Sequence, residues 1–264
     1  MFSAISGLTR SLAGQGRIIG ALMMREIMTR FGRKGLGFLW LIGEPLLFCL
    51  GVIVLWTALK PAYEHGIRIG PFVMTGYMCL LLLRHCIQYS SGALIGNSGL
   101  LYHKKITVYH IFFARNVLEF AGATAAFIIV YTMLFLMGQV GVPSDVLKLY
   151  GGWLLLAWLS MGFAVTIAAL GVEFEIMERL TPVMTYALIP LSGAFFMASV
   201  VPAQWRDLFL LIPFPNTIEM VRAGVFGEFV ETHYSASYAL MCGTVMNLIA
   251  LILLARVKHH MDVE

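Results

Sequence analysis

Residues 181–224 read TPVMTYALIPLSGAFFMASVVPAQWRDLFLLIPFPNTIEMVRAG, and this stretch decides the fold. Five of the nine prolines in the chain fall there: Pro182, Pro190, Pro202, Pro213 and Pro215. Residues 183–201 are apolar enough to cross a bilayer, whereas the apolar piece 208–214 is far shorter than the roughly 20 residues a spanning helix needs. Interrupted backbone at membrane depth requires surrounding protein or a wet cavity. The stretch therefore predicts a bent span followed by re-entrant helices, with an external loop lying on the lipid headgroups as the alternative.

The composition outside this stretch is that of an integral membrane protein. Hydrophobic residues make up 59% of the 264 residues and charged residues only 12%, against about 25% charged in a soluble domain. Six stretches reach spanning length: 36–59, 71–95, 111–138, 149–171, 182–201 and 236–255. Little sequence remains for a soluble catalytic or nucleotide-binding domain. We therefore expect one all-α transmembrane domain over residues 1–264, with six transmembrane helices.

The positions of the basic residues predict the orientation. With the N-terminus inside, most of the 18 lysine and arginine residues fall in cytoplasmic segments, as the positive-inside rule requires. This places both termini in the cytoplasm. The net charge of +4 reflects this bias and does not indicate nucleic-acid binding.

The segment 17–33 before the first span is amphipathic. At helical spacing, one arc carries Met23, Met24, Ile27, Met28 and Phe31. The opposite arc carries Arg25, Glu26, Thr29, Arg30 and Arg33. This pattern predicts a helix lying along the cytoplasmic leaflet, which either serves only as a lipid anchor or also touches a cytoplasmic partner.

Three ionisable residues lie inside predicted spans. Counted from the cytoplasmic ends at about 1.5 Å per residue, Glu44 and Glu119 lie about 12 Å deep and Arg84 about 16 Å. Charged groups at such depth usually face a bundle interior or a wet cavity. We expect the three to meet, either as an ion-paired cluster that joins the first three spans or as a contact for a transported substrate.

Two cytoplasmic connections are candidates for contact with a partner. The first, GNSGLLYHKKITVYHIFFAR (96–115), places Leu100 and Leu101 beside Lys104 and Lys105. It predicts either a helix projecting toward a partner or a surface turn. The second, GVEFEIMERLTP (171–182), is acidic. On the outer side, TIEMVRAGVFGEFVET (217–232) predicts an interfacial helix that leads into the last span.

Catalytic and nucleotide-binding motifs are missing from the sequence. It contains no GxxxxGK[ST] phosphate loop, no HExxH and no GxSxG, which are the motifs that would carry phosphate, zinc or acyl chemistry. We therefore expect no catalytic, cofactor-binding or metal-binding residues on this chain.

The order of these features resembles a known family. ALMMREIMTRFGRKGLGFLWLIGEPL (21–46), FFARNVLE (112–119) and IPFPNTIEMVRAG (212–224) are similar to segments of type-2 ABC exporter permeases, in particular the KpsM-like capsular-polysaccharide and Wzm-like O-antigen export permeases. The resemblance implies a permease homodimer in the bacterial inner membrane. Each copy would bind a separate KpsT-like ATPase that holds ATP and Mg. It also implies a periplasmic polysaccharide co-polymerase and an outer-membrane export protein as partners.

The resemblance also assigns expected roles to residues. The substrate would be a lipid-anchored glycan passing through a channel at the dimer interface. The expected ATPase contacts are Arg25, Glu26, Leu100, Leu101, Lys104, Lys105, Glu175 and Glu178. Aromatic rings that could stack on sugar faces near the outer half are Trp56, Tyr77, Trp153, Phe195, Phe196 and Trp205. The alternative for these rings is the ordinary aromatic belt of a membrane protein.

Other functions stay open from the sequence. One is a type-2 permease for O-antigen, teichoic acid, or a small lipid or drug, with the same fold. Another is a membrane enzyme acting on lipid-linked sugars, with Glu44 and Glu119 as its acid and base. No recognisable acid–base motif surrounds these two glutamates.

Overall fold

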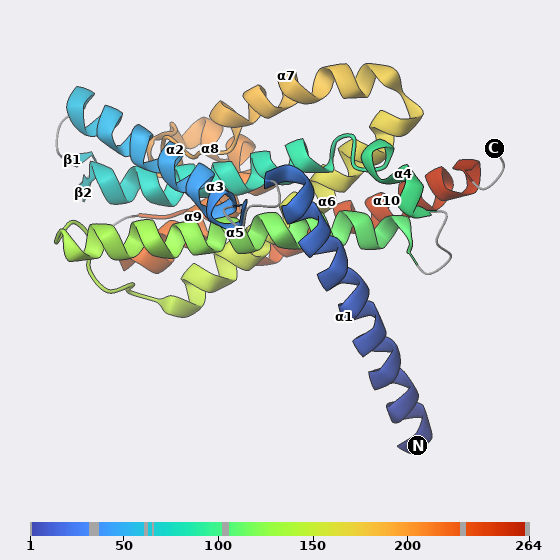
Figure 1. Ribbon diagram of the computed structural model, residues 1–264. Coiled ribbons are helices and arrows are strands. Elements are labelled where there is room, and N and C mark those ends of the chain that lie inside the picture. The colour runs from blue at the N-terminus through green and yellow to red at the C-terminus, as the bar shows by residue number, and fades with distance from the viewer. Residues whose placement is uncertain are drawn as a thin grey trace.

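The protein is a helical bundle with one short hairpin, seen in a computed structural model that describes residues 2–31, 37–60, 63–64, 66–101, 106–227 and 231–261 (Figure 1). The helices are α1 (Phe2–Phe31), α2 (Gly37–Leu59), α3 (Ile69–Ser90), η1 (Ile95–Asn97), α4 (Ser98–Leu101), α5 (Val108–Leu136), α6 (Val146–Glu173), α7 (Glu175–Leu191), η2 (Ala198–Val200), α8 (Ala203–Leu210), α9 (Pro213–Phe226) and α10 (Ala236–Met261). Strands β1 (Tyr63–Glu64) and β2 (Ile67–Arg68) pair antiparallel between α2 and α3.

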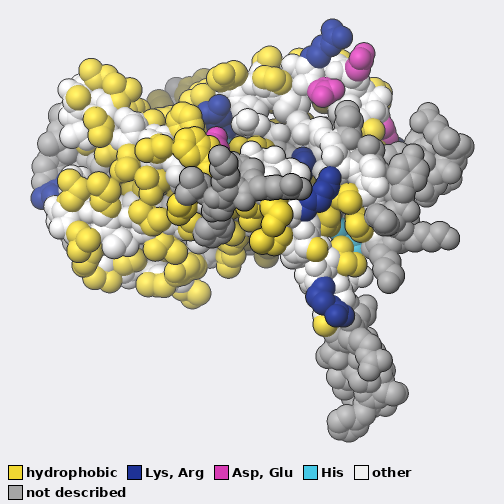
Figure 2. All heavy atoms as spheres, in the orientation of Figure 1, with side chains coloured by type: hydrophobic (Ala, Val, Ile, Leu, Met, Phe, Trp, Pro, Cys, Tyr) yellow, Lys and Arg dark blue, Asp and Glu magenta, His cyan; other side chains and the backbone are white. Residues whose placement is uncertain are grey.

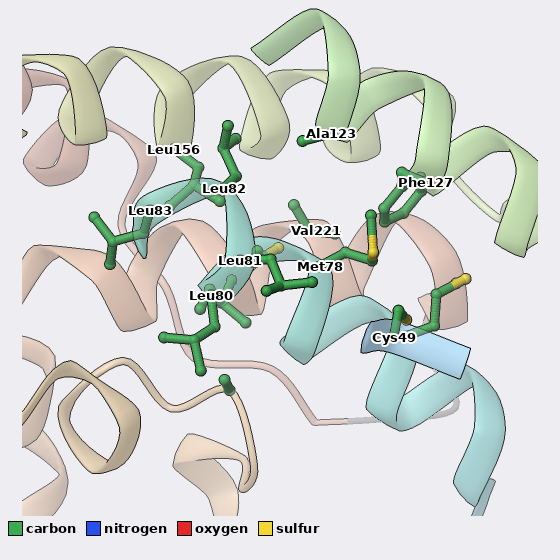
Figure 3. Packing of buried hydrophobic residues seen from close by; sticks show 14 of the residues in the cluster. Cys49, Met78, Leu80, Leu81, Leu82, Leu83, Ala123, Phe127, Leu156 and Val221 are labelled. Atoms are coloured by element: carbon green, nitrogen blue, oxygen red, sulfur yellow. The ribbon is translucent and has the colours of Figure 1, made fainter. Parts of the chain in front are cut away.

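Helix α3 is the centre of the bundle. It packs against α2, α5, α6, α7 and α9, and 94% of its most apolar window is buried. Figure 3 shows consecutive leucines of α3, Leu80–Leu83, pointing toward different neighbours, among them Leu156 of α6 and Val221 of α9. Polar residues such as Arg84, His85 and Gln88 make α3 the least apolar of the spanning helices, and polar groups inside a membrane usually face the interior of a bundle.

Five of the described helices, α2, α3, α5, α6 and α10, are long and apolar enough to cross a membrane. They match five of the six expected spans. Helices α2 and α10 are mostly exposed, with 22% of each apolar window buried, and Figure 2 shows apolar side chains covering much of the bundle surface. This surface suits a lipid environment. The charged side chains in that view gather mainly toward the end that carries α4 and the start of α7.

The fifth expected span, 182–201, is not a single helix. Helix α7 begins earlier, at Glu175, because the extended backbone of Phe174 separates it from α6. It ends at Leu191, and a turn with Gly193 at φ 72° follows. The succeeding helices α8 and α9 meet at an angle of 104°. By length and composition this bent pair is either a broken span or a re-entrant loop.

Helix α9 is buried rather than interfacial. Its apolar residues Ile218, Val221 and Val225 face the core, and Glu219 and Arg222 are also buried. Gly224 permits this packing on α6, because a Cβ there would lie 2.3 Å from the backbone nitrogen of Leu149. The expectation of an interfacial helix in this part of the chain was therefore wrong, since both the apolar and the polar side chains of α9 find partners inside the protein.

Helix α1 is longer than expected, and its N-terminal part extends away from the bundle (Figure 1). Its polar arc lies against the protein: Glu26 is 8% exposed, whereas Met24 and Met28 are each 54% exposed. Arg33, the last residue of the expected amphipathic segment, lies outside the described residues. Arg25, Glu26 and Arg30 of α1 therefore contact the protein interior.

Candidate functional site

A buried cluster of two arginines and two glutamates joins α1 to α5. The Arg30 guanidinium pairs with the carboxylate of Glu119 on α5, which is 2% exposed, and its Nε lies 2.8 Å from Glu26 Oε1. The same Glu26 oxygen lies 3.0 Å from Arg115 Nη2. We call Glu26, Arg30, Arg115 and Glu119 the ionic cluster. Buried charges are tolerated when paired and hydrogen-bonded in this way.

The cluster continues into α3 and α2 through an aromatic ring. The Arg30 guanidinium lies 3.8 Å from the centroid of the Tyr89 ring, a cation–π geometry. The Tyr89 hydroxyl donates to Glu44 at 3.4 Å, and His85 Nδ1 lies 3.6 Å from Glu119. Four helices therefore converge on one polar centre inside an otherwise apolar bundle.

Helix α1 is also bonded to the connection after α3. Arg25 Nη1 donates to Asn97 Oδ1 at 2.5 Å, and Asn97 Nδ2 donates to the Ala93 carbonyl at 2.8 Å. A displacement of the η1–α4 connection would therefore move α1 through these polar contacts.

The pKa of Arg30 reflects its two carboxylate neighbours. Burial alone would lower this pKa, but the carboxylates of Glu119 and Glu26 raise it above its usual value, so Arg30 stays charged.

The expected trio of Glu44, Arg84 and Glu119 does not form. Among the described residues, neither glutamate pairs with Arg84, whose guanidinium instead lies 5.7 Å from the Tyr186 ring centroid on α7. Successive residues of a helix point about 100° apart, so His85 faces α5 while Arg84 faces α7. Position along a span does not specify the direction in which a side chain points.

A second buried ion pair holds the turn after α7. Arg222 is fully buried and lies 3.2 Å from Glu219. Its guanidinium donates to the carbonyls of Gly193, Ala194 and Phe196 at 2.9, 2.6 and 2.8 Å. Glu219 accepts the backbone N–H groups of Ala198 and His233. Arg222 was not among the expected site residues, although its i,i+3 spacing from Glu219 near the proline at the start of α9 was a usable signal.

Side chains also satisfy the backbone around α8. Arg206 Nε donates to the Ala198 carbonyl at 3.0 Å. Asn216 Nδ2 donates to the Leu210 carbonyl at 2.8 Å, and its Oδ1 accepts the N–H of Ser235 at 2.9 Å. The proline-broken segment is therefore held by specific polar contacts, as interrupted backbone inside a protein requires.

The expected ATPase contacts fall into three groups. Leu100 and Leu101 form the half-buried end of α4, and Lys104 and Lys105 lie outside the described residues. Glu175 and Glu178 are exposed at the start of α7 and line a groove of about 520 Å³ together with the turn 90–94. Arg25 and Glu26 are engaged internally, Arg25 with Asn97 and Glu26 in the ionic cluster.

The aromatic residues expected along the substrate path lie in different parts of the structure. Trp56 stacks on Phe195 with ring centroids 5.1 Å apart, and Tyr77 lies 5.9 Å from the same ring. Phe196 contacts Phe209 on α8, and Trp205 is exposed. Trp153 instead lies in the core and donates to Thr124 at 2.9 Å, so its expected place beside a substrate path is not supported.

Comparison with known proteins places this architecture in a family. Residues 17–226 match the ABC-2 type transporter family. The chain is 37% identical to the capsule polysaccharide export inner-membrane protein CtrC of Neisseria meningitidis serogroup A, over 93% of each chain. It is 35% identical to the capsule polysaccharide export inner-membrane protein BexB of Haemophilus influenzae over 92% of each chain. It is 26% identical to the polysialic acid transport protein KpsM of Escherichia coli, over 89% of this chain and 91% of that one. Within the described residues, no group of three or more metal-ligating side chains occurs. The chain belongs to the ABC-2 type transporter family.

Proposed function

We propose that this chain is the inner-membrane permease of an ATP-driven exporter of lipid-anchored capsular polysaccharide. The observation that carries the proposal is its similarity, over nearly the whole chain, to the capsule export proteins CtrC and BexB. The sequence holds no phosphate-loop motif, so the energy must come from ATP hydrolysis on a separate chain.

The ATPase would bind the end of the bundle that carries α4 and the start of α7. The start of α7 lines a groove in which Glu175 and Glu178 approach the turn 90–94, and this turn leads into η1 and α4. The bond between Arg25 and Asn97 links this end to α1. A push on α4 would therefore reach the ionic cluster and, through Glu119, the spanning helix α5.

Two copies of the chain would enclose the channel. Helices α2 and α7 offer exposed apolar surfaces, including Phe48, Val54 and Val183, that a second copy would cover. In this arrangement α7 is the fifth crossing and α8–α9 dips in from the outside. The ring cluster of Trp56, Tyr77 and Phe195 is the best candidate for sugar stacking, because Trp56 and Tyr77 hold Phe195 in place.

A deletion and complementation experiment tests the function. Cells lacking this chain should lose surface polysaccharide and accumulate it inside, and a plasmid copy should restore export. The chain should also copurify with an ATPase that carries a phosphate loop. Normal surface polysaccharide in the deletion strain would overturn the proposal. Loss of efflux of a small apolar compound in that strain would favour the drug or lipid permease.

A further inference from the structure

A groove between α3 and α7 contains an arginine, Arg84, and a carboxylate, Glu178, which form no ion pair in the described part of the chain. The groove has a volume of about 310 Å³, and its lining includes Arg84 and Gln88 of α3 and Thr185 and Tyr186 of α7. Arg84 is half-buried, and its contact in the described structure is the Tyr186 ring at 5.7 Å.

Three other arginines of the helices that are buried or half-buried pair with carboxylates. Arg30 and Arg115 contact Glu26, and Arg222 contacts Glu219. Within the described part of the chain, no carboxylate lies at ion-pair distance from Arg84. A charge inside a membrane span is costly without a partner, so the arrangement around Arg84 favours the binding of an anion in the groove.

The position of the groove favours a lipid as the source of that anion. Arg84 lies about 9 Å along the axis from the last residue of α3, near the end of the bundle that carries α4 (Figure 1). The phosphates of a bilayer lie near the ends of its spanning helices, within reach of a long arginine side chain that lies less than two turns inside the span.

The side chains suit a phosphate. A guanidinium presents paired N–H donors that match phosphate oxygens, and the Gln88 amide adds a further donor. The hydroxyls of Thr181 and Thr185 donate to carbonyls of their own helix, so they shape the groove rather than bind the anion. We propose that this groove binds the phosphate group of a membrane lipid through Arg84.

Glu178 lines the same groove and weakens the site. Its carboxylate repels a bound phosphate, so the affinity stays moderate and the lipid can leave. The lipid would be either bulk anionic phospholipid or the anchor of the exported glycan. Only the second identification rests on the proposed function.

Native mass spectrometry of the purified full-length permease, titrated with phosphatidylglycerol, tests the site. Arg84→Gln should lower the affinity by about tenfold, because it removes a charge-assisted contact. Arg84→Lys keeps the positive charge but loses the paired N–H donors of the guanidinium, so it should lower the affinity less. Glu178→Gln should raise it. Arg179→Gln is the matched control, because it removes an equal charge one residue from Glu178 but outside the groove.

Equal binding by Arg84→Gln and the unmodified protein would overturn the proposal, as would an equal loss in Arg179→Gln. If Arg84→Gln does not fold, Glu178→Gln provides the test, and an affinity for phosphatidylglycerol no higher than that of the unmodified protein would overturn the proposal. Surface polysaccharide measured in cells with Arg84→Gln at normal protein level separates the two sources. A fall identifies the glycan anchor, and unchanged export identifies bulk phospholipid. The binding titration involves no export, so it stands even where the proposed function fails.

Discussion

The guanidinium of Arg30 pairs with the carboxylate of Glu119, a residue 89 positions later in the chain and almost completely buried. This contact fastens an N-terminal helix, most of whose length lies outside the bundle, to a membrane-spanning helix. Together with the bond between Arg25 and Asn97, it makes α1 a mechanical link between the η1–α4 connection and the interior.

Arg30→Gln should destabilise the permease strongly. The change leaves Glu119 buried without its cation, and removing one partner of a buried pair costs about 3–5 kcal/mol. The melting temperature in detergent and the amount of protein in membranes would both fall. The double variant with Glu119→Gln should recover part of the loss, because no uncompensated charge remains. Arg17→Gln, an exposed site on the same helix, is the control, and equal melting temperatures for Arg30→Gln and Arg17→Gln would contradict the assignment.

Arg222→Lys should loosen the turn after α7 without changing the charge. A lysine ammonium cannot reproduce the planar set of bonds to Gly193, Ala194 and Phe196, because it is a point charge on a flexible stem. A cysteine introduced at Ser199 should then react faster with a thiol reagent. Lys148→Arg, at an exposed site on α6, should leave the rate unchanged. Equal labelling in Arg222→Lys and the parent would show that the turn is held by other contacts.

Gly76→Ala should be far more damaging than an ordinary glycine substitution in a helix. A Cβ at Gly76 would lie 1.8 Å from the Ala194 carbonyl oxygen, so α3 and the turn after α7 would have to separate. Overpacking of this kind costs about 1–3 kcal/mol or more. Gly51→Ala in α2 is the matched control, since no atom lies within 4 Å of its Cβ, and it should be neutral or stabilising. Thermal unfolding of both variants measures the difference, and a Gly76→Ala protein as stable as Gly51→Ala would refute the close approach.

Single cysteines across 203–214 should report the placement of α8 and α9. In a background without Cys49, Cys79, Cys86 and Cys242, an impermeant thiol reagent added outside should label positions 205 and 208 quickly. Trp205 and Leu208 are exposed, whereas Phe214 is buried, so position 214 should label slowly and faster during transport. Fast labelling at every position would indicate a surface loop, and labelling only from the cytoplasmic side would overturn the predicted topology.

Most of the overall prediction rests on the apolar stretches of the sequence and on the catalytic and nucleotide-binding motifs that it lacks. Five expected spans match helices because about 20 consecutive apolar residues are stable only in contact with lipid or other apolar groups. The family resemblance was equally visible, because it rests on local segments such as 21–46 and 212–224. The breaks before α8 and α9, at Pro202 and Pro213, were also readable, since proline cannot continue a helical hydrogen-bond ladder. The other three prolines of this stretch lie inside helices, Pro182 and Pro190 in α7 and Pro215 in the first turn of α9.

What the tertiary structure decided was the direction of each polar side chain. Sequence position gives depth along a span, but a neighbouring helix must be placed before it is known which side of the span meets a partner. Arg84 and His85 are adjacent in the sequence, yet His85 meets Glu119 and Arg84 faces α7. Likewise, the polar arc of α1 could face either water or a buried ionic cluster. The positions of Arg115 and Glu119 on α5 decide between these two, because they supply the partners of Glu26 and Arg30. Hydrophobic periodicity is a one-dimensional signal, whereas charge pairing depends on contacts between segments far apart in the chain.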